Sequence, residues 1–372
     1  MSAEPSAFGE ALRAELAATD TDAVICVFVP PLRRGEEVTV AAELRQAVAG
    51  QPKPVLSTFL GFDGVPAELA AAGRESPMPG SIPSYSSPER AVTALARVCR
   101  YARWRRREPG RLPDLAGIAV DPARELLAGV LASAPAGRRL TDAETRQLLG
   151  YYGIEVVPAE RVRSLGQAIA AAERIGWPVA VKAIDAGQVR LRLHLADAED
   201  VRTAWPALGL PDEPNEPNEP NEPNDERLRE EPEVIVQAMA PRGVDTVLRL
   251  HDDRSFGALV SFGVGGLATD LLADRSYAVV PLTSTDAAEL IGGPRAFPLL
   301  TGYGGAEPAD LPALAELALR LSRLSDDLPE VVECALDPVV AAAAGAHVLA
   351  AEVRIAPPIA RADQGARRLR GW

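Results

Sequence analysis

Strands and helices alternate along residues 22–106, and this alternation constrains the fold more than any other feature of the sequence. The run "DAVICVFVP" is too continuously apolar for a sheet with one wet face, so it predicts a strand buried on both sides. Alternation of this kind is typical of a parallel sheet with helices on its faces. With three strands before residue 107, we expect a partial α/β sheet domain with an edge open to another chain. The expected strands are 22–30, 53–61 and 81–85, and the expected helices are 8–18, 37–49 and 86–107, the last with Ser87 as its N-cap.

A second domain is expected over residues 136–365, after a linker at 108–135 that contains one short helix. Its first helix follows Thr141, and Glu144 stands three residues later, which is the spacing of a capping box. The later segments "VDTVLRLHDD" and "FGALVSFGVGG" predict antiparallel strands, and "PEVVECALDPVVA" and "AHVLAAEVRIAP" predict a final strand pair. Residues 211–232 hold an acidic Glu-Pro-Asn repeat whose prolines cannot donate to a sheet. We interpret this repeat as a disordered surface insertion.

The composition excludes several classes of partner. The net charge is −13, so nucleic acid and anionic membranes would be repelled. No apolar run approaches the ~20 residues that span a bilayer, and the N-terminus lacks the basic and apolar regions of a signal peptide. The three cysteines lie far apart and match no metal or disulfide spacing. We therefore expect a cytoplasmic protein that binds neither nucleic acid nor membrane.

Lysine is rare in this chain, which uses arginine for most of its positive charge. Among 39 basic residues, only Lys53 and Lys182 are lysines. Lys53 precedes a strand, and we interpret it as a solvated residue at the strand start. Lys182 is surrounded by apolar residues in "GWPVAVKAIDA". Two interpretations of Lys182 stay open: a functional cation, or a salt-bridged lysine near a strand end.

Six segments occur in an order that resembles a known family. They are "LTDAETRQLLGYYGIEV", "IGWPVAVKA", "EVIVQAMAPRGVDTVL", "FGALVSFGVGGLATDLLADRSYAVVPLT", "LLTGYGG" and "VVECALDPVV". In this order they look like the ATP-grasp part of the ADP-forming acyl-CoA synthetases (acetate–CoA ligases). The preceding segments are similar to that family's succinyl-CoA-synthetase-like flavodoxin domain, and related actinobacterial proteins fuse the module to a GNAT acetyltransferase. The resemblance implies a partial flavodoxin-like domain over 1–107 and an ATP-grasp domain over 136–365.

The resemblance also implies an adenine-nucleotide site between two lobes of the ATP-grasp domain. In the family, a strand lysine contacts nucleotide phosphate, a hinge meets the adenine edge through backbone groups, and a glycine-rich turn follows. The matched ATP-binding residues are Lys182 for the lysine, Gln237, Ala238 and Met239 for the hinge, Asp245 for a glutamate of the family, and Gly263, Gly265 and Gly266 for the turn. An ordinary buried strand and an ordinary tight turn would give the same hinge and glycine patterns.

The loop that covers the phosphates in the family has no counterpart here. That loop follows the strand lysine and holds a histidine that carries a phosphoryl group. In this chain only "AIDAGQ" follows Lys182 before the next strand, which predicts a short hairpin turn with Gly187. The next strand, "VRLRLHL", alternates with period two, so we expect Arg190, Arg192 and His194 on one face and the leucines on the other. His194 is the histidine nearest to the lost loop and is a weak candidate for the phosphoryl carrier.

The magnesium end of the implied site is altered as well. The family has an acidic residue, one spacer and an asparagine before a proline, and oxygen ligands there hold magnesium beside the phosphates. Here the acidic residue is replaced by Ala335 and the asparagine by Asp337, which could still bind a cation. Gly304 replaces the arginine of the family's "GYRG" segment.

These features together predict an adenine-nucleotide-binding module with impaired ligase turnover. A full reaction would convert ATP, a carboxylate and CoA into acyl-CoA, ADP and phosphate, with ATP or ADP and Mg²⁺ as cofactors. CoA would be bound by a partner chain, because no segment like the family's CoA-binding Rossmann domain is recognised. The alternative is a non-catalytic regulatory or scaffold subunit, which would dock through the incomplete sheet onto an acetyltransferase or a complete synthetase.

Overall fold

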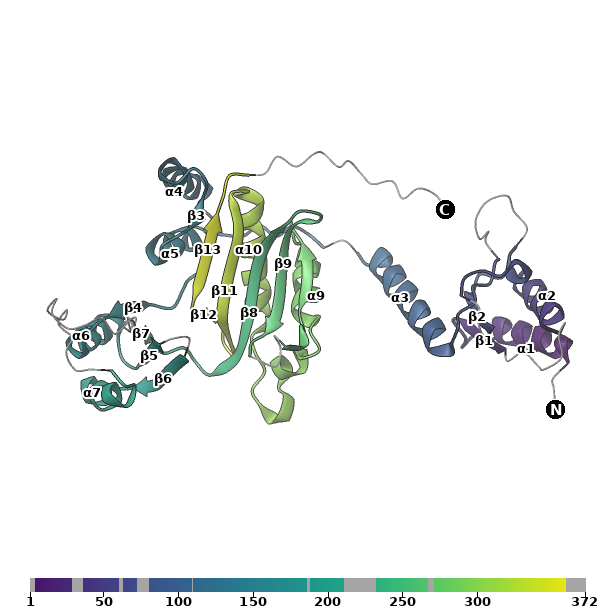
Figure 1. The fold of residues 1–372 in the computed structure, drawn as a ribbon, viewed down its shortest axis with the longest axis horizontal. Helices are drawn as coiled ribbons and strands as arrows, with labels where there is room; N and C mark the ends of the chain where they lie inside the picture. The colour runs from purple at the N-terminus through teal and green to yellow at the C-terminus, as the bar shows by residue number, and fades with distance from the viewer. Residues whose placement is uncertain are drawn as a thin grey trace, which may run out of the picture. The chain divides into compact units, whose positions relative to one another are not determined.

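The computed structural model describes residues 4–28, 36–59, 63–71, 80–108, 110–185, 188–210, 232–266 and 271–358. These residues form two compact units, one within 4–108 and one within 110–358 (Figure 1). The hairpin residue Gly187 and the Glu-Pro-Asn repeat, within 211–231, lie outside the described residues. None of the helices in the described part of the chain is both long and apolar enough to cross a membrane.

The first unit holds a parallel strand pair packed against helices. β1 runs beside β2 with Val24 opposite Val55 and Phe28 opposite Phe59. Apolar side chains of α1 and α2, including Leu12 and Leu44, are buried against this pair. The predicted parallel α/β arrangement is therefore confirmed. The elements are α1 (Pro5–Ala17), β1 (Val24–Phe28), α2 (Glu36–Val48), β2 (Val55–Phe59), the 3-10 helix η1 (Ala67–Leu69) and α3 (Pro88–Arg106).

Two details of the first unit differ from the sequence prediction. The strand at 22–30 was expected to be fully buried, but β1 is partly exposed, since Val27 is 51% exposed. It lies at the edge of the pair, where among the described residues no further strand covers it. The expected strand at 81–85 is reduced to bridges of Ser84 with Ser57 and Gly64. The start of α3 is as predicted, because the side chain of Ser87 accepts a hydrogen bond from the N–H of Arg90.

The described residues of the second unit form two antiparallel sheets. The large sheet has seven strands in the order β10-β9-β8-β11-β13-β3, with β12 also paired to β11, and the small sheet has the order β4-β7-β5-β6. The strands are β3 (Arg138–Arg139), β4 (Ala159–Val162), β5 (Val179–Asp185), β6 (Gln188–Leu195), β7 (Glu233–Ala238), β8 (Gly243–Asp253), β9 (Gly257–Val264), β10 (Ser276–Val279), β11 (Val331–Ala342), β12 (Ala346–Val348) and β13 (Ala351–Ile355). The helices are α4 (Val120–Ser133), α5 (Asp142–Gly150), α6 (Leu165–Ile175), α7 (Ala198–Ala207), α9 (Ser284–Gly292) and α10 (Leu311–Asp327), with 3-10 helices η2 (Phe297–Thr301) and η3 (Tyr303–Gly305).

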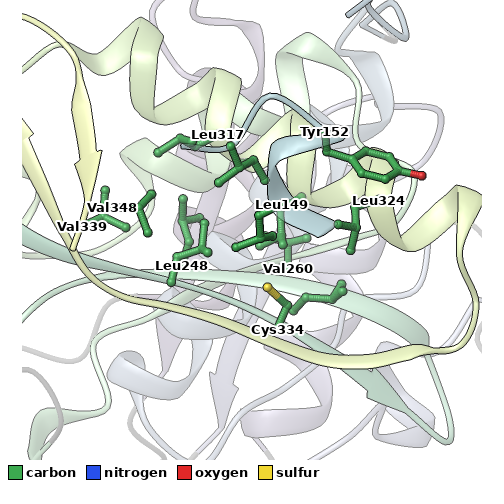
Figure 2. Close-up of a cluster of buried hydrophobic side chains, with 14 of the residues drawn as sticks. Leu149, Tyr152, Leu248, Val260, Leu317, Leu324, Cys334, Val339 and Val348 are labelled. Carbon is green, nitrogen blue, oxygen red and sulfur yellow. The ribbon is translucent and has the colours of Figure 1, made fainter. Parts of the chain in front are cut away.

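One face of the large sheet packs against helices and forms the main core. Figure 2 shows Leu149 of α5 and Leu317 of α10 beside strand residues such as Leu248. Successive side chains of a strand point to opposite faces, so burial of Leu248 and Leu250 sends Arg249 and its alternate neighbours to the other face. We call this other side, away from the helices, the open face of the large sheet.

The sequence placed residues 120–133 in a linker with one short helix, and the structure has a helix there that is not part of a linker. They form the helix α4, whose Ala123, Leu127 and Val130 are buried in the core of the second unit. These positions are three or four residues apart, so they lie on one side of the helix. The second unit therefore begins upstream of the expected boundary at 136.

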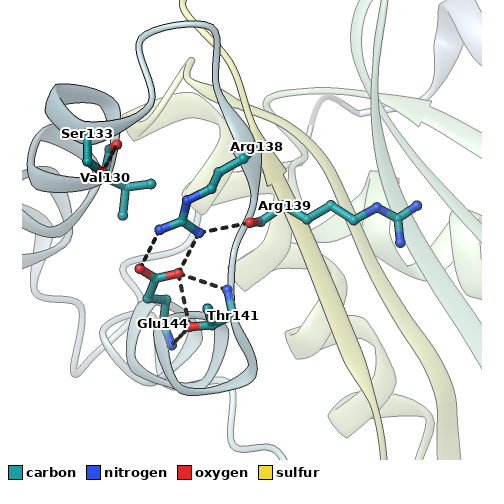
Figure 3. Close-up of polar contacts among 6 residues, drawn as sticks. All are labelled: Val130, Ser133, Arg138, Arg139, Thr141 and Glu144. Carbon is teal, nitrogen blue, oxygen red and sulfur yellow. Dashed lines mark hydrogen bonds and ion pairs between the residues drawn. The ribbon is translucent and has the colours of Figure 1, made fainter. Parts of the chain in front are cut away.

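The start of α5 is fixed by the predicted capping box and by an arginine that the sequence did not single out. Thr141 Oγ1 accepts from the N–H of Glu144 at 3.3 Å, and Glu144 Oε2 accepts from the N–H of Thr141 at 2.8 Å (Figure 3). Arg138 of β3 binds both oxygens of the same carboxylate, at 2.8 and 2.7 Å. Hydrogen bonds from Arg138 and Thr141 lower the pKa of Glu144 to about 2.

Candidate functional site

A cavity of about 600 Å³ lies on the open face of the large sheet. Alternation along β8, β9, β11 and β13 brings polar side chains to this face, because their neighbours in sequence are in the core. The residues that line it are Arg139, Arg249, Leu250, His251, Ser261, Arg275, Tyr277, Glu333, Cys334, Ala335, Asp337, Ala350, Ala351, Glu352, Val353 and Arg354. The cavity therefore includes Asp337 and Ala335, the two residues that the sequence resemblance aligned with a metal-binding segment.

Asp337 is bound to an arginine in this structure. Nη2 of Arg249 donates to Oδ2 of Asp337 at 2.7 Å, across the boundary between β8 and β11. Both side chains are partly open to solvent, Arg249 by 42% and Asp337 by 39%. The Nε of Arg249 is buried and has no hydrogen-bond partner among the described residues. The carboxylate predicted to hold a cation thus already has a cationic partner from the protein itself.

The other carboxylates of the cavity are also paired with arginines. Arg354 binds Glu333 through two nitrogens, at 3.0 and 2.9 Å, and this hydrogen bonding lowers the pKa of Glu333. Arg139 binds Glu352 at 2.6 Å. Each acid of the lining is therefore paired with a neighbouring guanidinium.

The residues present do not fit a magnesium ion. Mg²⁺ requires near-octahedral oxygen ligands and usually one or two carboxylates. Ala335 has no side-chain oxygen, and Asp337 would have to leave Arg249 to bind a metal. Among the described residues there is no cluster of three or more His, Cys, Asp or Glu side chains that could hold a metal ion.

Lys182 lies on the side of the small sheet opposite α6 and α7. Val181 and Ala183, its neighbours in β5, are buried in the core that α6 and α7 form, so Lys182 points to the other side. It is half-buried and has no hydrogen-bond or ion-pair partner among the described residues. Lys53, in contrast, donates to the carbonyl oxygen of Ala18 at 2.5 Å. The interpretation of Lys182 as a salt-bridged strand lysine therefore has no support within this part of the chain.

The connection after Lys182 is as short as predicted. Asp185 at the end of β5 pairs with Gln188 at the start of β6, so two residues join the strands. Arg190 and Arg192 share one face, as expected, and it is the face of α7, because they pair with Ala183 and Val181. The opposite face, shared with Lys182, carries the half-exposed apolar residues Val189, Leu191 and Leu193.

His194 stands at an irregularity in β6. The pairing register shifts there, and His194 has a φ of 60°, so the strict alternation predicted for this strand ends before it. Its N–H lies 3.5 Å from the Sδ of Met239. The position is exposed and close to the hinge, and it is not on a mobile loop of the kind the resemblance describes for a phosphoryl carrier.

The hinge residues connect the two sheets. The Gln237 side chain donates from Nε2 to the carbonyl oxygen of Leu349 at 2.6 Å, and the next carbonyl, of Ala350, accepts from the N–H of Asp337 at 3.0 Å. The N–H of Ala238 and of Met239 donate to carbonyl oxygens of Pro158 and Pro178. Leu349 and Ala350 therefore link the hinge to Asp337. The N–H groups of Ala238 and Met239 are already hydrogen-bonded, so they are not free to bind an adenine edge.

The glycine turn lies directly beside Asp245. The N–H of Gly265 donates to the carbonyl oxygen of Asp245 at 2.6 Å, and a Cβ on Gly265 would stand 3.1 Å from the Asp245 Cβ. Gly266 has a φ of 110°, which favours glycine, and Gly263 is paired with Val247 in the sheet. Asp245, like Arg249, lies on the open face, since Thr246 and Leu248 are fully buried between them.

The arginines of the cavity, above all Arg249, were not singled out from the sequence. A signal was present, because "VLRLH" places Arg249 between leucines that belong to a core strand. Such an arginine must lie on the opposite face of the sheet, next to whatever the neighbouring strands bring there. Only the strand order shows that the neighbour is Asp337.

Comparisons with known proteins agree with this architecture. The family model described as an ATP-grasp domain matches residues 132–355. ADP-forming acetate–CoA ligase I of Archaeoglobus fulgidus is 32% identical over 69% of this chain, but the match spans 36% of that enzyme's length. The beta subunit of ADP-forming acetate–CoA ligase II of Pyrococcus furiosus is 30% identical over 58% of this chain and 90% of its own length.

A solved structure gives the same result at the level of the fold. Acetyl-coenzyme A synthetase 1 of Ca. Korarchaeum cryptofilum, in complex with coenzyme A, Ca-AMPCP and HgCl+, has a TM-score of 0.50 and 29% identity. The match covers 63% of this chain and 99% of that chain. The chain therefore belongs to the family of ADP-forming acetate–CoA ligases, and its second unit is an ATP-grasp domain.

Proposed function

We propose that the chain is an adenine-nucleotide-binding ATP-grasp module whose ligase turnover is reduced or lost. Lys182 is the observation that carries this proposal. It is half-buried in β5, next to the strand β7 that ends at the hinge, and has no partner among the described residues. Leaving an ammonium half-buried and unpaired is unfavourable, and an anionic ligand would relieve it. Nucleotide phosphate is the anion that the resemblance assigns to this lysine.

Impaired turnover follows from what the site lacks. The two-residue connection after β5 leaves no room for a loop that could carry a phosphohistidine. The acidic side chains of the cavity are engaged by arginines and do not form a metal site. Preorganised charge of this kind commonly supplies several orders of magnitude in rate, so its loss should reduce turnover severely.

The relatives suggest what a complete system would contain. The Ca. Korarchaeum cryptofilum protein was solved with coenzyme A and a nucleotide analogue, and the Pyrococcus furiosus match is named as a beta subunit. We propose that CoA reaches this chain only through a partner, which would be a CoA-binding chain or an acetyltransferase of the GNAT type. With such a partner the reaction would join a carboxylate to CoA and convert ATP to ADP and phosphate in the cytoplasm.

Calorimetric titration of the purified full chain with ATP and with ADP tests the proposal. We expect micromolar binding that Lys182→Ala weakens by about tenfold, equivalent to about 1.4 kcal/mol. Lys53→Ala is the matched control, because Lys53 is bound to a backbone carbonyl in the first unit and should leave binding unchanged. No binding heat for either nucleotide, with or without magnesium, would refute a nucleotide site.

A second candidate function is a non-catalytic scaffold or regulatory subunit. The observation that favours it is the unpaired edge of β1, where Val27 is half exposed among the described residues. An edge strand of this kind can pair with another chain. Replacement of Val27 by proline or lysine should then abolish co-elution with a purified complete acyl-CoA synthetase or acetyltransferase, while nucleotide binding stays absent.

A further inference from the structure

We infer that the cleft of this chain binds its nucleotide without a divalent cation, with the guanidinium of Arg249 in the role that metal-dependent ATP-grasp enzymes give to magnesium. The inference rests on the proposed function, since it specifies the ionic form in which the proposed nucleotide binds. Its basis is the pairing of Arg249 with Asp337 on the open face of the large sheet.

The position of Arg249 is the first part of the argument. Asp337 marks the place where family members hold a cation beside the phosphates, and the Nη2 of Arg249 lies 2.7 Å from its Oδ2. The same face carries Asp245 next to the glycine turn, and Asp337 is joined to the hinge through Leu349 and Ala350. A positive charge is therefore already fixed where a phosphate-bound metal would be needed.

The charge balance of the lining is the second part. The cavity is lined by four arginines and three acidic residues among the described residues, so its lining is net positive in a chain whose net charge is −13. A divalent cation entering this site would be repelled by the guanidinium and would have to break an existing ion pair. A phosphate would be attracted, because a guanidinium presents several N–H donors that match phosphate oxygens.

The hydrogen bonding of Arg249 is the third part. A guanidinium has five N–H donors, and Asp337 takes one at 2.7 Å while Nε is buried without a partner among the described residues. A buried donor without a partner destabilises the folded state. Asp337 accepts from only one of these donors. A ligand oxygen that lets the side chain shift and satisfy its remaining donors would therefore stabilise Arg249.

The prediction concerns the metal dependence of binding. Free ADP carries more negative charge than its magnesium complex, so a net positive lining should bind the free form at least as tightly. We expect the Kd of the wild-type chain for ADP to be equal or lower in EDTA than in magnesium chloride. We also expect Mn²⁺ alone, followed by electron paramagnetic resonance, to remain unbound.

Two variants test the role of the ion pair by calorimetry in EDTA. Arg249→Ala should weaken ADP binding by about tenfold and make it respond to magnesium, because Asp337 is then a free carboxylate. Asp337→Asn should keep metal-free binding or tighten it, because Arg249 is then free to bind phosphate, and it guards against misfolding of the first variant. Arg174→Ala is the matched control, since Arg174 forms a similar bidentate pair with Glu160 outside the cavity.

The outcomes separate this inference from the proposed function. ADP binding that requires magnesium in the wild type, or that Arg249→Ala leaves unchanged in EDTA, would overturn the inference while the nucleotide site stands. Absence of binding in both buffers would overturn the nucleotide site and the inference together. Equal or tighter binding in EDTA, weakened about tenfold by Arg249→Ala and kept in Asp337→Asn, would establish the guanidinium as the cation of the site.

Discussion

Glu144 connects the beginning of the second unit to its large sheet, and its removal should loosen α5 locally. The carboxylate accepts two hydrogen bonds from Arg138 of β3, at 2.8 and 2.7 Å, and one from the N–H of Thr141. The substitution Glu144→Gln keeps the size of the side chain and an acceptor for Thr141. It removes the charge that Arg138 binds.

The magnitude follows from the pKa and from exposure. Hydrogen bonds from Arg138 and Thr141 lower the pKa of Glu144 from its ordinary 4.5 to about 2, which by linkage corresponds to at most about 3 kcal/mol. The side chains of Arg138 and Glu144 are 35% and 23% exposed, so water screens the pair. We therefore expect Glu144→Gln to reduce the stability of α5 by about 1–2 kcal/mol.

The effect of pH has a definite sign. The folded-state pKa of Glu144 is depressed, so its contribution is complete above the unfolded value near 4.5 and is lost as pH falls toward about 2. The difference between wild type and Glu144→Gln should therefore be full at pH 7. It should shrink to about two fifths at pH 3, from the same linkage relation.

Hydrogen exchange of peptides from residues 138–150 measures this effect directly. A loss of about 1–2 kcal/mol raises exchange by about 5- to 30-fold relative to wild type at the same pH. Peptides from α6 serve as an internal control, because α6 is capped by Ser164 and takes no part in the capping box of Thr141 and Glu144. Equal exchange in the two proteins at pH 7, or a difference that grows at pH 3, would refute the reasoning.

Two further predictions concern the glycine turn and the core. Gly265→Ala places a Cβ 3.1 Å from both the Cβ and the carbonyl oxygen of Asp245, whose backbone is held in β8, so thermal unfolding should show a loss of about 1–2 kcal/mol. Gly129→Ala in α4 has nothing within 4 Å and should be neutral or stabilising, and equal losses in the two variants would contradict the steric argument. Burial raises the pKa of the Cys334 thiol to about 12, so a disulfide reagent at pH 8 should label it only after denaturation, and labelling of the native protein would show that its surroundings open.

Local patterns in the sequence were sufficient for the starts of α3 and α5 and for the β5–β6 hairpin. The capping residues Ser87 and Thr141 act as predicted, because a cap depends on residues within one turn of each other. The short β5–β6 hairpin was also predictable, since two residues can join strands in few ways. One short helix was expected where α4 lies, but its place in the core of the second unit was not, because that depends on packing against residues far away in the sequence.

The candidate site required the tertiary structure. The sequence pointed to Lys182, the hinge, the glycine turn and Asp337 through their order along the chain, and their roles in binding remain proposals. It could not reveal that Asp337 meets Arg249, because the two residues are 88 positions apart and become neighbours only when β8 pairs with β11. Caps and hairpins depend on residues that are close in sequence. The partner of a charged side chain depends instead on strand register, which is set by how the whole sheet buries its apolar face.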